Sequence, residues 1–300
     1  MSHDIFAEPV DMNDVLQKIE RIRSVFLNTQ VFYSKQDNMN ALIGYLENTD
    51  IEFRSIAYES ASMAIAVKDL QNNQELNTWL FYANVLARAH RAQVYVGLGW
   101  AIAKLNLPFL PVVEKIESCL YYRVADGCGF YDGSFRQRQT VLNQQLPAYL
   151  PGAAMPLYDQ GIGRSFWYTC NGDMKEVCRK VNSFPAGRQA SLWRGIGIAV
   201  AYVGASDENT LKTLLQLSST KRLELACGAA LAARSRLDAN TMNVDTNRCS
   251  RLWYTLTAGK TKIFSSEPTD MKKEEDYFNW IKRAEERLAD SFEKGIIDIL

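Results

Sequence analysis

Pairs of small residues recur at nearly constant intervals in segments that are otherwise apolar. Within a pair the residues are two positions apart, and the first residues of successive pairs are separated by 30, 34, 34 and 33 positions. A degenerate copy stands earlier, at Ser60 and Ser62. A fixed period of this length is typical of repeat proteins. The five clear pairs are Gly97/Gly99, Gly127/Gly129, Gly161/Gly163, Gly195/Gly197 and Gly228/Ala230.

Shorter amphipathic stretches separate these segments. In one of them, Val177, Val181 and Phe184 follow the spacing of a helix. A capping or proline residue precedes three of the stretches, as expected at the start of a helix. These residues are Pro108, Asp173 and Asp207. Each unit is therefore predicted to be a glycine-bearing helix, a turn and a second helix.

Glycine inside a helix costs about 1 kcal/mol relative to alanine, so paired glycines indicate that neighbouring helices approach closely. The chain is accordingly predicted to be all-α, an α-solenoid of about six helix pairs in a TPR-like superhelix with a repeat of about 34 residues. A dinucleotide fingerprint at Gly195 and Gly197 is excluded, because no strand precedes it and the third glycine is missing.

The prediction divides the chain into three parts. Residues 1–50 form an N-terminal helical cap, 51–240 the helical-repeat array, and 241–300 a C-terminal connection with a charged amphipathic capping helix. A polar connection is expected after Arg236, followed by a helix around residues 251–258. One face of the last helix is expected to pack on the array through Tyr277, Trp280, Ile281, Ala284 and Leu288.

Composition is that of a soluble globular chain, with 47% hydrophobic and 23% charged residues. The acidic start lacks a secretory signal, and the longest apolar run, residues 195–205, is too short to span a membrane. The six cysteines include no C-x-x-C pair, so we expect a reduced, cytoplasmic protein. The acidic block Glu274–Asp276 and the apolar end GIIDIL leave translocation by a specialised secretion system as the alternative.

The formal charge of zero argues against a nucleic-acid partner. It conceals a net −4 in residues 1–119, +8 in 120–266 and −4 in 267–300. The basic centre is suited to an anionic small molecule, an acidic partner protein or the acidic ends of the chain itself. The oligomeric state stays open.

Only His3 and His90 are present, so metal sites built on paired histidines are excluded, and no metal or cofactor is expected. His90 lies in a helical pattern and is interpreted as a structural histidine. The position before each first glycine carries Asp126, Gln160 and Arg194 in three successive repeats. This ladder is either a buried hydrogen-bonded register or one wall of a ligand groove.

Arg164 is the lone charge in an otherwise apolar column, where it needs a partner such as Asp159 or Asp132. Aromatic residues concentrate around it, and they are either core or a pocket lining. The candidate ligand-binding residues are Asp126, Tyr131, Asp132, Tyr158, Asp159, Gln160, Arg164, Trp167, Trp193 and Arg194.

The segments GCGFYDGSFRQRQ, YDQGIGRSFWY, LWRGIGIAVAYVG and ELACGAALAARSR resemble successive blocks of an uncharacterised bacterial family. That family is found with polyketide pathways, notably enediyne biosynthesis, and the resemblance covers residues 50–255. It implies a cytoplasmic accessory role in secondary metabolism, without assigned catalytic residues.

Three functions follow as hypotheses. The first is a helical-repeat protein that binds a partner protein or an anionic aromatic, polyketide-like metabolite through the basic central repeats. The second is a metal-independent all-α cyclase or isomerase with acid–base chemistry. Its residues would be Asp126, Asp132 or Asp159, assisted by Tyr131, Tyr158 and Arg164. The third is a secreted bacterial effector that engages a host protein.

Overall fold

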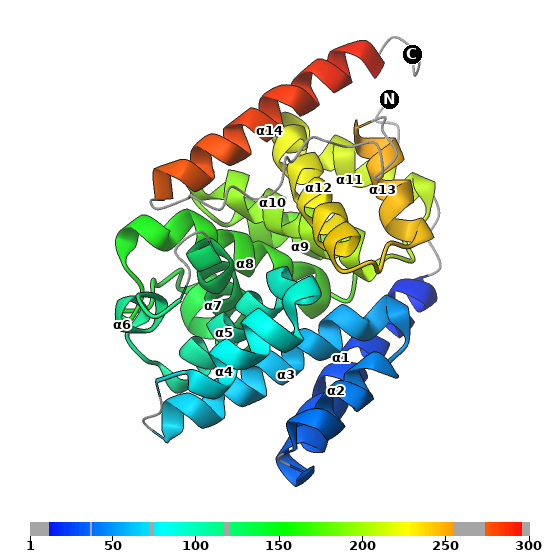
Figure 1. Cartoon of the computed structure of the whole chain (residues 1–300). Coiled ribbons are helices and arrows are strands. Elements are labelled where there is room, and N and C mark those ends of the chain that lie inside the picture. Colours follow the sequence, from blue (N-terminus) through cyan, green and yellow to red (C-terminus); the bar gives the residue numbers. More distant parts are fainter. Residues whose placement is uncertain (1–11, 37, 73–74, 117–119, 255–273, 296–300) are drawn as a thin grey trace.

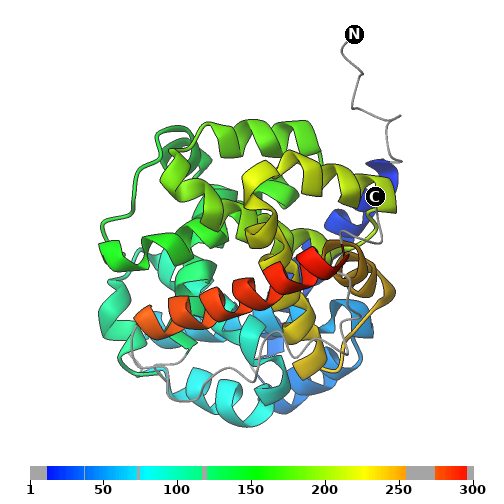
Figure 2. The same cartoon turned by 90° about the horizontal axis from the view of Figure 1, so that it is seen from above.

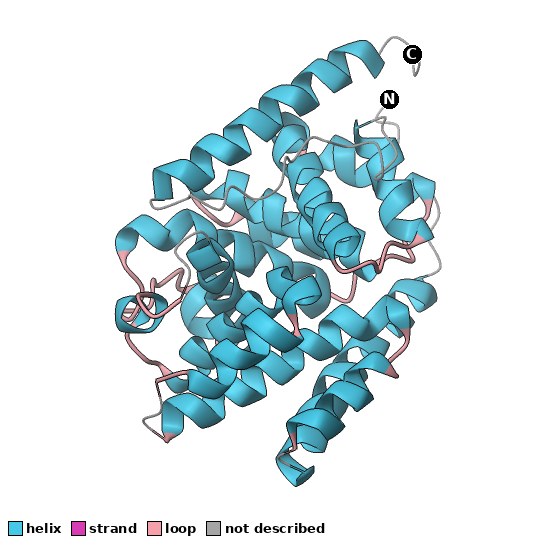
Figure 3. Ribbon diagram, viewed as in Figure 1, coloured by secondary structure: helices cyan, strands magenta, loops and turns pink. Residues whose placement is uncertain are grey.

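The structure is a computed structural model that describes residues 12–36, 38–72, 75–116, 120–254 and 274–295. Every regular element in these ranges is a helix, which confirms the all-α prediction (Figure 3). Cys119, His3 and the end GIIDIL, on which parts of the sequence interpretation rest, lie at least partly outside the described residues.

The small-residue pairs lie on six helices that pack side by side in sequence order (Figure 1). We call these six the A helices. They are α3 (Ile51–Gln71), α5 (Arg91–Leu105), α7 (Tyr121–Phe135), α8 (Met155–Thr169), α10 (Ala186–Val203) and α12 (Arg222–Asp238).

Shorter helical elements connect the A helices. They are α4 (Asn77–Phe81) with the π turn Tyr82–Leu86, α6 (Phe109–Val113), the π turn Arg138–Leu142, α9 (Met174–Asn182) and α11 (Glu208–Leu217), and α13 (Val244–Tyr254) follows the last A helix. The predicted caps are confirmed at α9 and α11, where Asp173 accepts from the Lys175 amide at 2.9 Å and Asp207 from the Thr210 amide at 2.7 Å.

The predicted polar connection after Arg236 is wrong in extent, because α13 already begins at Val244 and ends at Tyr254. Its polar residues are helical and partly internal: Thr246 is buried and donates from its hydroxyl to the Ala201 carbonyl at 2.8 Å. Trp253 is also buried and donates to the Leu211 carbonyl at 2.9 Å. Tertiary hydrogen bonds therefore help to hold α13 in place, and the first part of this helix lacks the apolar period from which a helix is predicted.

The paired glycines let the A helices touch through their backbones. A Cβ atom on Gly161 would collide with the Asp126 carbonyl oxygen of α7, and one on Gly163 with the Leu192 carbonyl oxygen of α10. The same arrangement recurs down the row, with the first small residue facing the preceding helix and the second facing the next. A carbonyl oxygen so near a glycine Cα is the geometry of a Cα–H···O contact.

The two ends of the row are linked to each other. Arg236 near the end of α12 donates to the Glu52 carbonyl of α3 at 3.3 Å and to the Tyr202 carbonyl of α10 at 2.8 Å. The hydroxyls of Ser55 and Thr241 lie 3.4 Å apart. The row therefore curves until its first and last helices meet.

Two further helices cover the row. The helix α1 (Met12–Gln36), followed by α2 (Met39–Glu47), packs on α3, where Ser60 donates to the Phe26 carbonyl at 2.5 Å. The helix α14 (Glu274–Gly295) lies across the A helices (Figure 2). Its five predicted packing residues are all buried: Tyr277, Trp280, Ile281, Ala284 and Leu288.

His90 is buried, as its structural interpretation requires. Its Nδ1 lies 2.9 Å from the Ser55 hydroxyl, and its ring stacks on Tyr58 at 3.9 Å between centroids. Burial lowers the pKa of His90 to about 4, so the ring is neutral at pH 7. The ring therefore joins α3 to the turn before α5.

We predict that Gly161→Ala lowers the free energy of unfolding by about 3 kcal/mol, because the three atoms nearest to the new methyl group are backbone atoms of α7 and α7 and α8 must separate. Gly187→Ala is the matched control, since no atom lies within 4 Å of its added Cβ. That variant should gain up to about 1 kcal/mol. Urea unfolding of both variants measures the difference, and equal stabilities would contradict the close packing.

Candidate functional site

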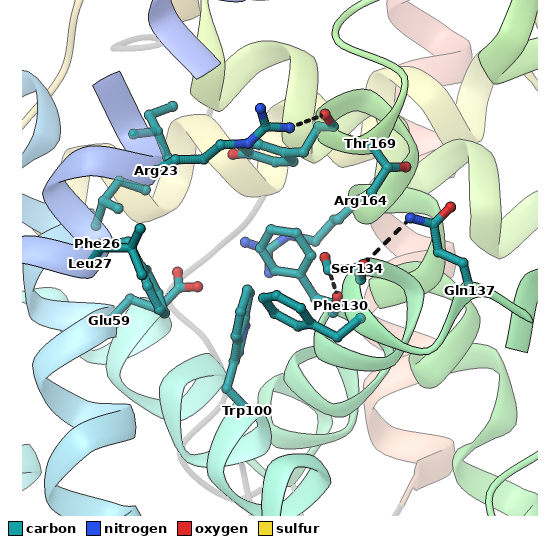
Figure 4. A pocket seen from close by; sticks show the side chains of 14 residues that line it. Arg23, Phe26, Leu27, Glu59, Trp100, Phe130, Ser134, Gln137, Arg164 and Thr169 are labelled. Carbon is teal, nitrogen blue, oxygen red and sulfur yellow. Dashed lines mark hydrogen bonds between the residues drawn. The ribbon is translucent and has the colours of Figure 1, made fainter. Parts of the chain in front are cut away.

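A cavity of about 440 Å³ lies where α1 meets four A helices, α3, α5, α7 and α8. Most of its wall is apolar or aromatic, and it includes Phe26, Trp100, Phe130 and Phe135 (Figure 4). The Trp100 ring lies edge-on to the Phe130 ring, with their centroids 4.8 Å apart, and it is tilted against the Phe26 ring, with centroids 4.9 Å apart. The aromatic wall is therefore assembled from three different helices.

Arg164 of α8 is the buried cation of this cavity, and the partly exposed Arg23 of α1 is a second cation in its wall. Arg164 is 6% exposed, pairs through Nη1 with Asp126 of α7, and lies over the Phe130 ring at 4.7 Å. Its Nε has no hydrogen-bond partner in the described part of the chain. The sequence-based partners, Asp159 and Asp132, were wrong. Arg164 lies one helical turn after Gln160, on the face that carries the predicted ladder, and that ladder supplies Asp126.

Glu59 of α3 is the residue that sequence analysis missed. It is 2% exposed, it lines the cavity, and its Oε2 has no hydrogen-bond partner among the described residues. Burial raises the pKa of Glu59 to about 7; Arg164 lowers it and Asp126 raises it further. Glu59 directly precedes Ser60, so extending the ladder position by two repeats, past Val96 to the degenerate pair, would have found it.

The predicted ladder continues from Asp126 away from the cavity. Gln160 donates from Nε2 to Asp126 Oδ2 at 2.7 Å and accepts from the Tyr277 hydroxyl of α14 at 3.3 Å. Arg194 pairs with Glu285 of α14 at 2.8 Å. The helix α14 therefore covers this half of the ladder, and part of the central basic excess is neutralised by the acidic C-terminal segment.

The other candidate acids have partners of their own. Asp132 accepts from Arg136 at 2.8 Å, from the Tyr149 hydroxyl at 2.8 Å and from the Tyr158 hydroxyl at 2.9 Å. Burial raises the pKa of Asp132, although these partners act in the opposite direction. This carboxyl group is thus enclosed by donors from three segments of the chain.

Asp159 is held by Arg188, which donates to its two oxygens at 2.8 and 2.5 Å. Burial raises the pKa of Asp159, and Arg188 lowers it. With Asp126 bound to Arg164 and Gln160, none of the three acids proposed for acid–base chemistry is left without a donor.

The aromatic candidates are spread over the core. Trp167 and Trp193 are buried and do not line the cavity. Tyr131 is half-buried, with its ring edge-on to Trp100 at 5.7 Å. Of the ten candidate residues predicted from the sequence, Arg164 alone lies in the cavity wall. Two others lie directly behind the wall: Asp126 contacts Arg164, and Tyr131 contacts Trp100.

In the described ranges, no group of three or more His, Cys, Asp or Glu side chains is arranged to hold a metal ion. No helix of the described chain is long and apolar enough to cross a membrane.

A family model described as a protein of unknown function, DUF1702, matches residues 8–288. The chain therefore belongs to this family, whose model spans α1, the six A helices and most of α14. No curated protein and no solved structure matches it.

We predict that Glu59→Gln stabilises the protein increasingly as the pH rises. Because the folded pKa of about 7 exceeds the usual 4.5, the stability that protonation of Glu59 contributes is complete below pH 4.5 and is lost as the pH rises through 7. The gain of the variant should grow from near zero at pH 4 to about 3 kcal/mol at pH 8.

Urea unfolding from pH 4 to 8 measures this gain, with Glu114→Gln at an exposed position as the control. A flat difference between the wild type and Glu59→Gln would mean that folding does not shift the pKa of Glu59.

Proposed function

We propose that this chain is a helical-repeat binding protein of bacterial secondary metabolism. Its ligand is an anionic, aromatic or polyketide-like molecule held in the cavity between α1 and the A helices. The row of A helices acts as a TPR-like solenoid that supplies the cavity wall, and the protein works in the cytoplasm as an accessory to biosynthesis.

The composition of the cavity wall carries this proposal. Three of the buried polar atoms that lack partners among the described residues belong to Glu59, Trp100 and Arg164, and all three residues line this one mainly apolar cavity. Leaving such atoms unpaired costs about 1–3 kcal/mol each, so a ligand that pairs with them gains specificity. A volume of about 440 Å³ is in the range of small-molecule sites.

The rim of the cavity supports an apolar ligand. Leu27 of α1 is 62% exposed and Phe135 of α7 is 65% exposed, and both line the cavity. A molecule bound with its charged end at Arg164 would cover these two side chains with its apolar part.

One observation favours a small molecule over an acidic partner protein, and a second supports an accessory role in the cytoplasm. Arg164, Arg188 and Arg194 of the basic centre are buried or nearly so and paired inside the protein, so they offer little charge to an outside surface. The described cysteines Cys128, Cys170, Cys178, Cys227 and Cys249 form no disulfide, in keeping with a reducing compartment.

We predict that the wild type binds two fluorescent probes, the anion anilinonaphthalene sulfonate and its uncharged relative phenylnaphthylamine. Arg164→Gln should weaken binding of the sulfonate tenfold or more, because a charge-assisted hydrogen bond is worth about 1.5–3 kcal/mol, and should leave phenylnaphthylamine bound.

Arg188→Gln is the matched control. It breaks the buried pair with Asp159 at a similar cost in stability, about 3–5 kcal/mol, but lies outside the cavity wall. Fluorescence titration at a temperature where both variants are folded measures the affinities. Equal sulfonate affinity in the two variants, or no probe binding by the wild type, would overturn the proposal.

A further inference from the structure

Glu59 and Arg164 point into the cavity from opposite sides (Figure 4). Arg164 already has one anionic partner, Asp126. An ionised Glu59 would place a second negative charge near the same guanidinium, whereas a neutral Glu59 leaves the cluster of three residues without net charge.

Among Glu59 and the ionisable groups around it, Glu59 is the one whose charge changes near neutral pH. Burial raises the pKa of Tyr168 and of Tyr202 above the usual 10.0, so both hydroxyls stay protonated. Arg23 of α1 is engaged by Glu20 and by the Tyr168 carbonyl. The ionisable groups around Glu59 are Arg23 of α1, Asp126 of α7, Arg164 and Tyr168 of α8, Tyr202 of α10 and Arg236 of α12.

We propose that Glu59 couples ligand binding to proton uptake: its neutral form admits an anionic ligand beside Arg164, and its ionised form excludes that ligand. This inference rests on the proposed function of the cavity and names its regulation. The ligand class is an apolar acid with one anionic group.

The physical reason is the net charge that the buried site would carry with a ligand bound. Asp126, an ionised Glu59 and a ligand anion would surround one guanidinium, and the unbalanced charge is expensive away from water. When Glu59 is protonated, the ligand anion takes the place of its negative charge. The protonated carboxyl then donates its O–H to the ligand, while the free Nε of Arg164 donates an N–H.

The same two probes test this coupling on the full chain. The sulfonate is an anion throughout the range from pH 6 to 9, so any pH dependence of its binding comes from the protein. In the wild type its affinity should fall roughly tenfold per pH unit above about 7. In Glu59→Gln the affinity should stay at its low-pH value across the range.

Phenylnaphthylamine carries no charge, and its affinity should be the same at every pH in both proteins. Glu114→Gln should behave as the wild type with both probes, since Glu114 is exposed and outside the cavity wall. Calorimetric titration of the sulfonate at pH 8 in two buffers of different ionisation enthalpy should show uptake of nearly one proton by the wild type and none by Glu59→Gln.

The outcomes separate the two proposals. If the wild type binds both probes but its sulfonate affinity does not depend on pH, or if Glu59→Gln keeps the wild-type pH dependence, the coupling is wrong and the binding function stands. A parallel loss of both probes at high pH would show that the cavity itself changes, which also overturns the coupling. If neither probe binds at any pH, the binding function fails and the coupling with it.

Discussion

Backbone contact between neighbouring A helices sets the geometry on which the remaining structure depends. At Gly129, Gly161 and Gly195 a carbonyl oxygen of the adjacent helix occupies the place where a Cβ would stand. Helices usually pack 8–10 Å apart, according to the side chains between them, and small residues permit the lower end of this range. The contact also fixes register, because each glycine accommodates one carbonyl and a shift of one residue would place a side chain there.

Fixed register aligns the side chains that precede the glycines. Glu59, Asp126, Gln160 and Arg194 stand at equivalent positions on four A helices, and each is buried. Buried polar groups of this kind require partners. Asp126 and Gln160 form a hydrogen bond, and Arg194 forms an ion pair with Glu285 of α14. Glu59 has an oxygen without a partner among the described residues, in the cavity next to α1. The same repeat therefore gives Arg194 an acidic partner under α14, although its Nε has no partner among the described residues, and leaves a Glu59 oxygen without a partner under α1.

The local parts of this arrangement could be predicted from the sequence. The glycine period predicts the A helices, Asp173 and Asp207 predict two helix starts, and Tyr277 with Trp280 predicts the buried face of α14. The acid that pairs with Arg164 was predicted wrongly, because aligned repeat positions do not contain the angle between α7 and α8. That angle determines which acid Arg164 reaches. The buried face of α1 follows a helical period through Val15, Ile19 and Ile22, but the place where α1 docks depends on single contacts between residues far apart in sequence, such as Arg23 with the Tyr168 carbonyl.

The distribution of charge then decides how a ligand would be attracted. The excess of +8 in residues 120–266 already counts Asp126 and Asp159, which pair with buried Arg164 and Arg188, and Glu285 of α14 neutralises one further arginine, Arg194. Exposed charges are screened within about 10 Å at ordinary salt, whereas a buried guanidinium is screened far less. Attraction in the cavity is therefore short-ranged and depends on which protons the cavity holds. Under the proposed function, the ligand would be selected after entry, by the balance between Arg164 and Glu59, and not by the net charge of the surface.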